Sequence, residues 1–389
     1  MPRRRTPRIS AELRERETVK PLELFFDLVM VLAFTQCTTL MADHGSWGGL
    51  GEGVLVLAIL WWSWVGYAWL TSVIDPEEGP VRLVMIGAMA GLLIASLCVP
   101  EAFGERAAMF AVAYVSVRAA HIALFFIASR EHADLRHSVV GLGVSTAVSA
   151  APLVVGAIVG GATQVVLWSL AVLVDWGGPA LYGAAGWRLV PGHFAERHGL
   201  VIILALGESV VALGVGAHVD LDAGATTAVV LGIGLTSALW WTYFDVVSLV
   251  TARRLAQAEE GAVRNALARD SYSYLHFPMV AGIVLGALGL HRTIEHVGDP
   301  LEGPYAAALL GGTALYLLGH VVLRLRNART LNRQRFALAV LLLATIPLAQ
   351  HADALVTLSA VVALLWAMIA YETHLYDDRR YRLRHGLEP

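Results

Sequence analysis

Residues 138–160 read S-V-V-G-L-G-V-S-T-A-V-S-A-A-P-L-V-V-G-A-I-V-G and contain no charged side chain. This stretch is longer than the about 20 residues that an α-helix needs to cross a hydrocarbon core about 30 Å thick. We expect transmembrane helices here and at residues 21–41, 50–74, 81–100, 107–128, 163–186, 199–217, 225–250, 271–290, 304–323, 336–350 and 354–374. The eleventh stretch is the shortest and contains Pro347. The sequence therefore predicts an all-α, polytopic transmembrane helix bundle of about twelve helices.

The composition excludes a soluble globular domain. The 389 residues are 57% hydrophobic and 15% charged, with a mean hydropathy of +0.63, whereas charged residues alone make up about a quarter of soluble domains. If the N-terminus lies inside, the inside loops and tails hold all of the 28 lysines and arginines except Arg106, Arg118 and Arg292. The positive-inside rule then predicts cytoplasmic tails at residues 1–20 and 376–389. The expected partner is the lipid bilayer, with no nucleic acid.

Two parts of the chain resemble each other in collinear order. W-W-S-W at 61–64 aligns with W-W-T-Y at 240–243, and His121 aligns with His320. Because six spans precede the second copy, both copies enter the membrane in the same direction, and we expect parallel six-helix repeats at 21–190 and 191–375. Chance similarity between apolar helices is the alternative. The link at 251–270 is longer than its counterpart, and its charges among alanines predict a short cytoplasmic surface helix.

Ionisable residues inside the predicted spans are the strongest functional signal. A charge that faces lipid at the bilayer centre costs about 2.5–3.5 kcal/mol on insertion scales, so such residues usually face a protein interior or an aqueous cavity. We expect one polar cavity, open to the cytoplasm, with an ion or substrate pathway formed by Asp27, Arg118, His121, Asp175, Glu208, Asp245 and His276. One arginine among these carboxylates leaves an acidic excess, which protonation or a bound cation would balance. For Arg118 a purely structural ion pair is the alternative, and a lone histidine such as His320 more often packs than binds.

Three motifs occur in order along the chain. They are E-L-F-F-D-L at 23–28, H-F-x-E-R-x-G-L at 193–200 leading to L-G-E-S at 206–209, and D-x-Y-S-Y-x-H-x-x-M-x-x-G at 270–282. Over about residues 20–375 the chain resembles the low temperature requirement protein A (LtrA) family of bacterial membrane proteins. The resemblance implies a multi-pass protein of the bacterial cytoplasmic membrane and leaves the molecular activity open. It adds weight to the motif positions Glu23, Phe26, His193, Glu196, Arg197, Tyr272 and Tyr274.

Three kinds of function compete. Parallel repeats and intramembrane carboxylates favour a transporter or channel-like protein for a small solute, proton or cation. An intramembrane enzyme acting on a lipid or isoprenoid is the alternative, because Glu, Asp, His and Tyr can serve as acids and bases. The sequence has no G-x-S-x-G or H-E-x-x-H motif, and we expect no catalytic residues, metal or cofactor. Metal ligation by His193, Glu196 and His198 is a weaker alternative. A membrane sensor or scaffold linked to growth at low temperature is the third candidate, and it would need a partner protein.

Overall fold

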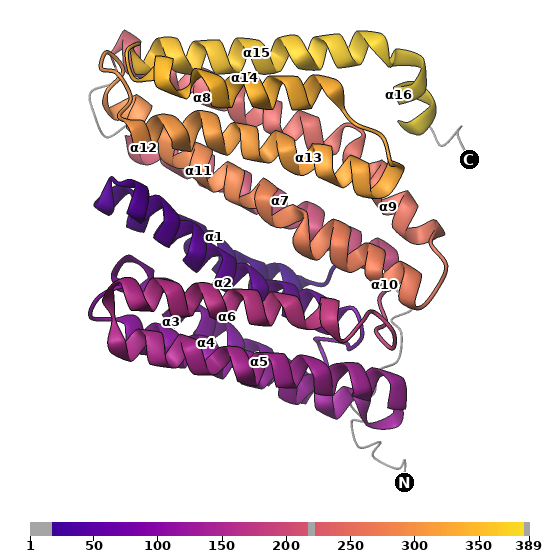
Figure 1. Cartoon of the computed structure of the whole chain (residues 1–389). Helices are drawn as coiled ribbons and strands as arrows, with labels where there is room; N and C mark the ends of the chain where they lie inside the picture. The colour runs from indigo at the N-terminus through magenta and orange to yellow at the C-terminus, as the bar shows by residue number, and fades with distance from the viewer. Residues whose placement is uncertain (1–17, 217–221, 385–389) are drawn as a thin grey trace. The chain divides into compact units, whose positions relative to one another are not determined.

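Spanning segments must satisfy their own backbone hydrogen bonds, because lipid offers no partners for N–H and C=O groups. In the computed structural model, which describes residues 18–216 and 222–384, this requirement is met by helices, and the described residues contain no β-strand (Figure 1). The first half contains α1 (Pro21–His44), α2 (Trp47–Thr71), α3 (Gly79–Cys98), α4 (Ala107–Ala128), α5 (Ala133–Val159) and α6 (Gly161–Leu181). The basic tail predicted at 1–20 lies almost entirely outside the described residues.

The remaining helices follow residue 190. They are α7 (Pro191–Gly216), α8 (Ala223–Phe244), α9 (Val247–Gln257), α10 (Ala262–Ala268), α11 (His276–Glu295), α12 (Gly303–Ala306), α13 (Gly312–Ala328), α14 (Arg333–Ala349), α15 (Ala354–Leu375) and α16 (Asp377–Arg384). Two π-helical segments, η3 (Arg269–Tyr274) and η4 (Ala307–Gly311), precede α11 and α13. Short 3₁₀ turns, η1 (Val99–Glu101) and η2 (Ser129–Glu131), follow α3 and α4.

Eleven helical segments of the described chain are long and apolar enough to cross a membrane. The protein is therefore a polytopic helical membrane protein, with one such segment fewer than the twelve predicted. The missing one is the predicted span at 336–350, which is helix α14 of 17 residues. At about 1.5 Å per residue, α14 rises about 26 Å, a little less than the hydrocarbon thickness. It packs against α13 and α15.

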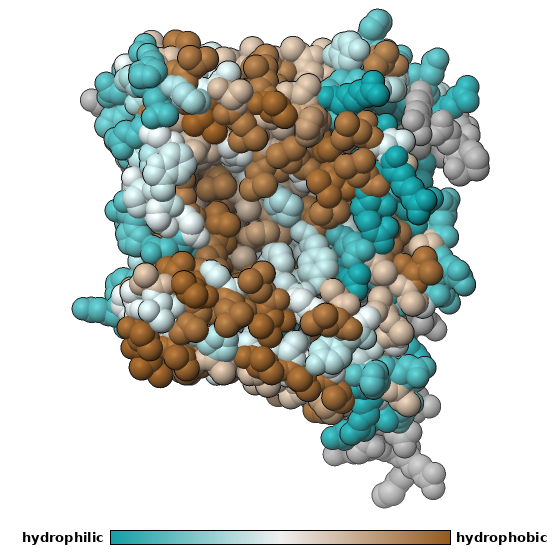
Figure 2. All heavy atoms as spheres, viewed as in Figure 1, coloured by the Kyte–Doolittle hydropathy of each residue, from teal (hydrophilic) through white to brown (hydrophobic). Residues whose placement is uncertain are grey.

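Apolar side chains on the outside of the helices account for the preference for lipid. Leu83, Ile158, Leu173 and Val230 are between 65% and 75% exposed, which would be unfavourable for so many large side chains in water. Within each of the two units defined below, hydrophobic residues cover the middle stretch of the helices, and hydrophilic residues gather toward the helix ends (Figure 2). This pattern fits helices that cross a bilayer with their ends in the interfacial regions.

The chain divides into two compact units. Unit 1 comprises residues 18–40, 55–197 and 258–269 of the described chain, and unit 2 comprises residues 41–54, 198–216, 222–257 and 270–384. In unit 1, helices α3 to α6 pack as successive neighbours, with α5 against α6 over most of their lengths. In unit 2, α11 packs closely on α13, and α15 packs on α8 and α14. The repeats predicted at 21–190 and 191–375 stay a prediction.

Close packing in unit 2 depends on a glycine in the middle of α11. A β-carbon on Gly282 would lie 2.5 Å from the carbonyl oxygen of Gly312 on α13. Only glycine lets the two backbones approach this closely, as small residues commonly do in membrane helix pairs.

The link at 251–270 forms two short helices instead of the one surface helix predicted. The first, α9, begins before the link at Val247, and α10 follows a turn at Gly261. Helix α10 is not simply a solvated connector, because Asn265 is buried and its Nδ2 donates to the carbonyl oxygens of Ala184 and Trp187 in unit 1, at 3.0 and 2.6 Å. Those carbonyls lie in an irregular segment and need donors, which explains the docking.

Candidate functional site

Two of the three motifs meet in unit 1. Glu23 and Asp27 lie one turn apart on α1, and His193 and Arg197 lie one turn apart on α7. His193 Nε2 lies 2.9 Å from Glu23 Oε1, and the Arg197 guanidinium donates to Asp27 Oδ1. All four side chains are at most 1% exposed. The i, i+4 spacing on both helices thus builds two parallel polar pairs between them, Glu23 with His193 and Asp27 with Arg197.

Neighbouring side chains fix the orientation of Arg197. Its Nη1 donates to Thr71 Oγ1 at 2.9 Å, its guanidinium lies 5.4 Å from the Trp64 ring centre, and Trp64 Nε1 donates to Asp27 at 2.7 Å. A buried charge is tolerated only when it is paired and hydrogen-bonded. Asp27 Oδ1 meets that condition, whereas Asp27 Oδ2 and Arg197 Nε have no hydrogen-bond partner among the described residues. Glu23 also accepts from the backbone N–H of Lys20 at 2.9 Å, so it caps the start of α1 as well as pairing with His193.

A second charged cluster in unit 1 surrounds Arg118. Its Nη2 donates to Asp175 Oδ1 at 3.0 Å and to Thr146 Oγ1 at 2.8 Å, and Thr146 donates to the same carboxylate oxygen at 3.0 Å. His121 lies one turn along α4, with its Nδ1 3.5 Å from Arg118 Nη1. A β-carbon on Gly66 would lie 2.8 Å from both side chains, so the glycine leaves room for them. This cluster matches the structural ion pair considered as an alternative for Arg118.

The third motif forms an aromatic cluster in unit 2. His276 begins α11, stacks on Tyr272 with ring centres 5.0 Å apart, and is fully buried. Its Nδ1 lies 2.9 Å from the carbonyl oxygen of Ser271 in the π-helical segment η3. Because a carbonyl can only accept, Nδ1 carries the proton, and Nε2 then accepts from the Tyr243 hydroxyl at 2.8 Å. The π-helical turn is what brings that carbonyl to the histidine, a role such turns often have at functional sites.

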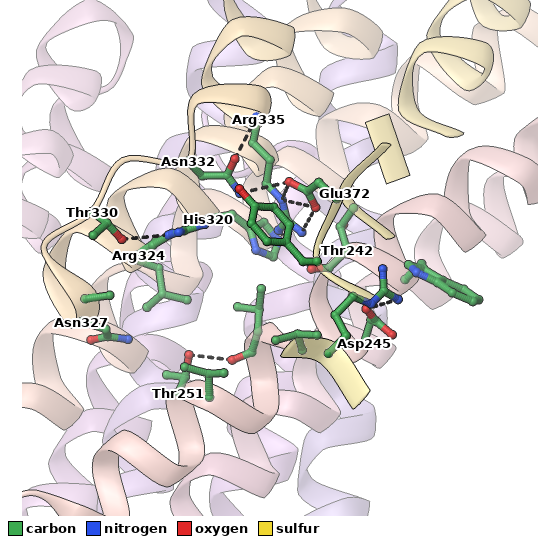
Figure 3. Close-up of a pocket in the computed structure, with 18 of the residues that line it drawn as sticks. Thr242, Asp245, Thr251, His320, Arg324, Asn327, Thr330, Asn332, Arg335 and Glu372 are labelled. Atoms are coloured by element: carbon green, nitrogen blue, oxygen red, sulfur yellow. Dashed lines mark hydrogen bonds and ion pairs between the residues drawn. The ribbon is translucent and has the colours of Figure 1, made fainter. Parts of the chain in front are cut away.

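A cavity of about 360 Å³ lies beside this cluster in unit 2 (Figure 3). Its wall comes from α8, α9, α13, α14, α15 and α16, and it contains the charged residues Asp245, Arg324, Arg335, Glu372 and Arg380. Arg335 and Glu372 form a bidentate pair, with Nη2 to Oε2 at 2.9 Å and Nε to Oε1 at 3.1 Å. The carboxylate of Asp245 pairs with Arg380 and Arg384 of α16.

His320 forms the inner wall of the cavity. It is 3% exposed, and neither ring nitrogen has a hydrogen-bond partner. Its ring lies 4.7 Å from the Tyr316 ring centre and 6.0 Å from that of Tyr243, both edge-on. It packs as a lone histidine usually does, but its polar atoms are left unsatisfied, which costs about 1–3 kcal/mol per group.

The remaining predicted residues lie apart from these clusters or contribute less. Glu208 is a buried residue of α7 in unit 2, at 2% exposed. Phe26 is buried against Tyr67 with ring centres 4.8 Å apart. Glu196 accepts from the backbone N–H of Val19 at 3.0 Å near the surface, and Tyr274 is half-buried. One cavity shared by the predicted pathway residues stays a prediction.

The structure buries more arginines than the one that the sequence analysis counted among the pathway residues. Sequence reasoning placed Arg197 in a loop, and it left Arg335 and Arg380 outside the membrane as well, although Arg197 is fully buried and Arg335 is 7% exposed. Each of these arginines pairs with a carboxylate. His193 and Arg197 have the same i, i+4 spacing as Glu23 and Asp27. This match was the feature of the sequence that could have indicated a contact between the two pairs. Among residues 18–216 and 222–384, no three His, Cys, Asp or Glu side chains are grouped to hold a metal ion.

Comparison with known proteins identifies the family. Residues 18–370 match the family model described as bacterial low temperature requirement A protein (LtrA). An uncharacterized protein of Rhizobium meliloti (strain 1021) is 30% identical over 321 residues, which cover 79% of this chain and 78% of the relative. No solved structure matches the chain. The chain therefore belongs to the LtrA family of bacterial membrane proteins.

Proposed function

We propose that the protein is a transporter that moves a small solute through unit 2 in exchange with, or together with, protons. The observation that carries this proposal is the cavity whose inner wall is the buried, unpartnered His320. A pocket of about 300–1,000 Å³ with a few polar groups is typical of small-molecule sites. Its location among the ends of membrane-length helices, next to ionisable side chains, is typical of a transport pathway.

A proton route is supported by the groups behind the cavity wall. Tyr243 donates to His276 Nε2, and its ring lies edge-on to His320 with ring centres 6.0 Å apart, so this tyrosine adjoins both imidazoles. Histidine is the side chain whose ordinary pKa permits proton exchange near neutral pH. We infer that a side-chain rotation brings the Tyr243 hydroxyl within hydrogen-bond reach of His320. The hydroxyl then gives its own proton to His276 Nε2 as it takes one from the His320 ring.

Proton flux into proteoliposomes tests this proposal. Full-length protein is reconstituted with a pH-sensitive dye inside, a potassium diffusion potential is applied, and dye response is recorded with and without each member of a solute panel. We expect solute-dependent flux in the wild type and a loss of at least about tenfold in Tyr243→Phe, which keeps the ring and removes the hydroxyl.

Tyr305→Phe is the matched control, because Tyr305 is a tyrosine of the same unit whose hydroxyl donates to the carbonyl oxygen of Ala42 at 3.3 Å, outside the cavity. It should retain wild-type flux. Equal flux in Tyr243→Phe and wild type would refute the proton route, and absence of any flux across the panel would refute transport.

A further inference from the structure

The charged groups in the wall of the unit 2 cavity do not all have an ion-pair partner. Arg335 and Arg380 are paired with Glu372 and Asp245, which are the two carboxylates in the wall. Arg324 is a third guanidinium in the wall, and no ion pair joins it to any described residue; its Nε donates to Thr330 Oγ1 at 3.0 Å. The wall thus carries one positive charge more than its carboxylates balance.

The uncommitted hydrogen-bonding capacity of the same wall consists mainly of donors. Trp241 Nε1 is buried without a partner, and an indole N–H can only donate. His320 offers one donor and one acceptor when neutral, and neither nitrogen is used. The acceptor oxygens of Glu372, by contrast, already receive Arg335 and Asn332. A ligand rich in acceptors would satisfy these donors, whereas a cation would find every carboxylate occupied.

Most of the wall surface is apolar, although threonine and asparagine side chains also line it. Val246, Val247 and Val250 come from the junction of α8 and α9 and from α9 itself, and Leu323 and Ile369 come from α13 and α15. Apolar side chains gain about 25 cal/mol for each Å² that a ligand removes from water. An anionic head beside Arg324 would therefore be accompanied by a hydrocarbon body.

We propose that this cavity binds an organic anion with a carboxylate or phosphate head and an apolar body. The role of this ligand as a transported solute rests on the proposed function. Its binding does not require transport. The head accepts from Arg324, His320 and Trp241, and the apolar body lies against the valines of α9. The ligand source is either a soluble amphiphilic acid or a membrane lipid with the same head.

Equilibrium binding to the purified full-length protein in nanodiscs tests the proposal. The probes are radiolabelled octanoate and octyl phosphate as soluble anions, with octyltrimethylammonium as a cation of similar apolar body. Nanodiscs with and without phosphatidic acid distinguish the lipid source, because a bound lipid would compete with octanoate. We expect saturable binding of at least one anion and no competition by the cation.

Variants locate the site. Arg324→Gln removes the uncommitted charge without leaving a carboxylate unpaired, and it should weaken anion binding about tenfold or more, as expected for loss of a charge-assisted hydrogen bond of about 1.5–3 kcal/mol. Arg324→Lys should retain most of the binding, which separates charge from folding. Trp241→Phe should weaken it severalfold. Arg333→Gln alters an exposed arginine outside the cavity and should bind as the wild type does.

The outcomes separate this proposal from the transport proposal. Saturable anion binding without any flux would uphold the site and refute transport. Proton flux with no anion binding, equal affinity for the cation, or wild-type affinity in both Arg324→Gln and Trp241→Phe would overturn the anion site.

Discussion

Substitutions in the buried ion pair of Asp27 and Arg197 test how much this pair contributes to the stability of the fold. Both side chains are at most 1% exposed, and two unit charges about 4 Å apart attract by about 4 kcal/mol at an effective dielectric constant of 20. Removing one partner of such a pair typically costs about 3–5 kcal/mol, because the other charge stays buried and uncompensated. The structure predicts that the two single substitutions differ within this range.

Asp27→Asn should lie at the lower end of that range. The amide still accepts from Trp64 Nε1, and Arg197 keeps Thr71 and has Glu23 Oε1 at 3.8 Å. Arg197→Gln should lie at the upper end, since it leaves Asp27 and Glu23 one turn apart on α1 with His193 as the nearest balancing group. The double variant should cost less than the sum by about 1–3 kcal/mol, as for other contacting pairs.

The assay is reversible unfolding in mixed micelles of increasing SDS content, monitored by helix content, for the wild type, both single variants and the double variant. Glu260→Gln is the control, because the Glu260–Arg264 pair has a glutamate that is 86% exposed and such surface pairs contribute at most about 1 kcal/mol. A cost below about 1 kcal/mol for Arg197→Gln, or strict additivity in the double variant, would refute the reasoning.

Other outcomes follow from packing and topology. Gly282→Ala should destabilise the protein by about 1–3 kcal/mol in the same assay, because its β-carbon would overlap a backbone oxygen of α13. Gly286→Ala should not, because no atom lies within 4 Å of its β-carbon. Equal effects of the two substitutions would contradict the packing. Gly66→Ala should separate the side chains of the Arg118 cluster and also lower stability, and an unchanged unfolding curve would contradict this. A cysteine at Ser46 should react with an impermeant reagent from outside cells, and reaction only from inside would overturn the predicted topology.

Hydropathy predicted the helices well because spanning a bilayer is a property of each segment alone. The predicted span that is too short, α14, also has a local explanation. The helix ends at Ala349, soon after Pro347, and contains only 17 residues. The eleven other predicted spans match membrane-length helices, although their ends differ by several residues.

Partners of buried charges were harder to predict, since they depend on contacts between distant segments. Arg197 lies 170 residues from Asp27, and Arg335 lies 37 from Glu372. Hydropathy places a residue within or outside a spanning segment but gives no information on which distant side chains it contacts. Arg380 lies in the segment predicted as a cytoplasmic tail and was therefore not considered as a partner of Asp245, with which it pairs in the cavity wall.

The polar clusters of the two units differ in how their charges are balanced. In unit 1 the carboxylates of Glu23, Asp27 and Asp175 each have a cationic or imidazole partner, and moving any one of them would expose a charge to a medium that cannot solvate it. Such clusters hold helices in fixed positions. Within the described chain, unit 1 also leaves buried atoms without partners, among them Asp27 Oδ2 and Arg118 Nε. In unit 2, however, the unsatisfied His320 and Trp241 line a cavity, where a bound ligand can recover that cost. Substrate chemistry is therefore better sought in the cavity, while the two motifs that meet in unit 1 mark the scaffold on which it depends.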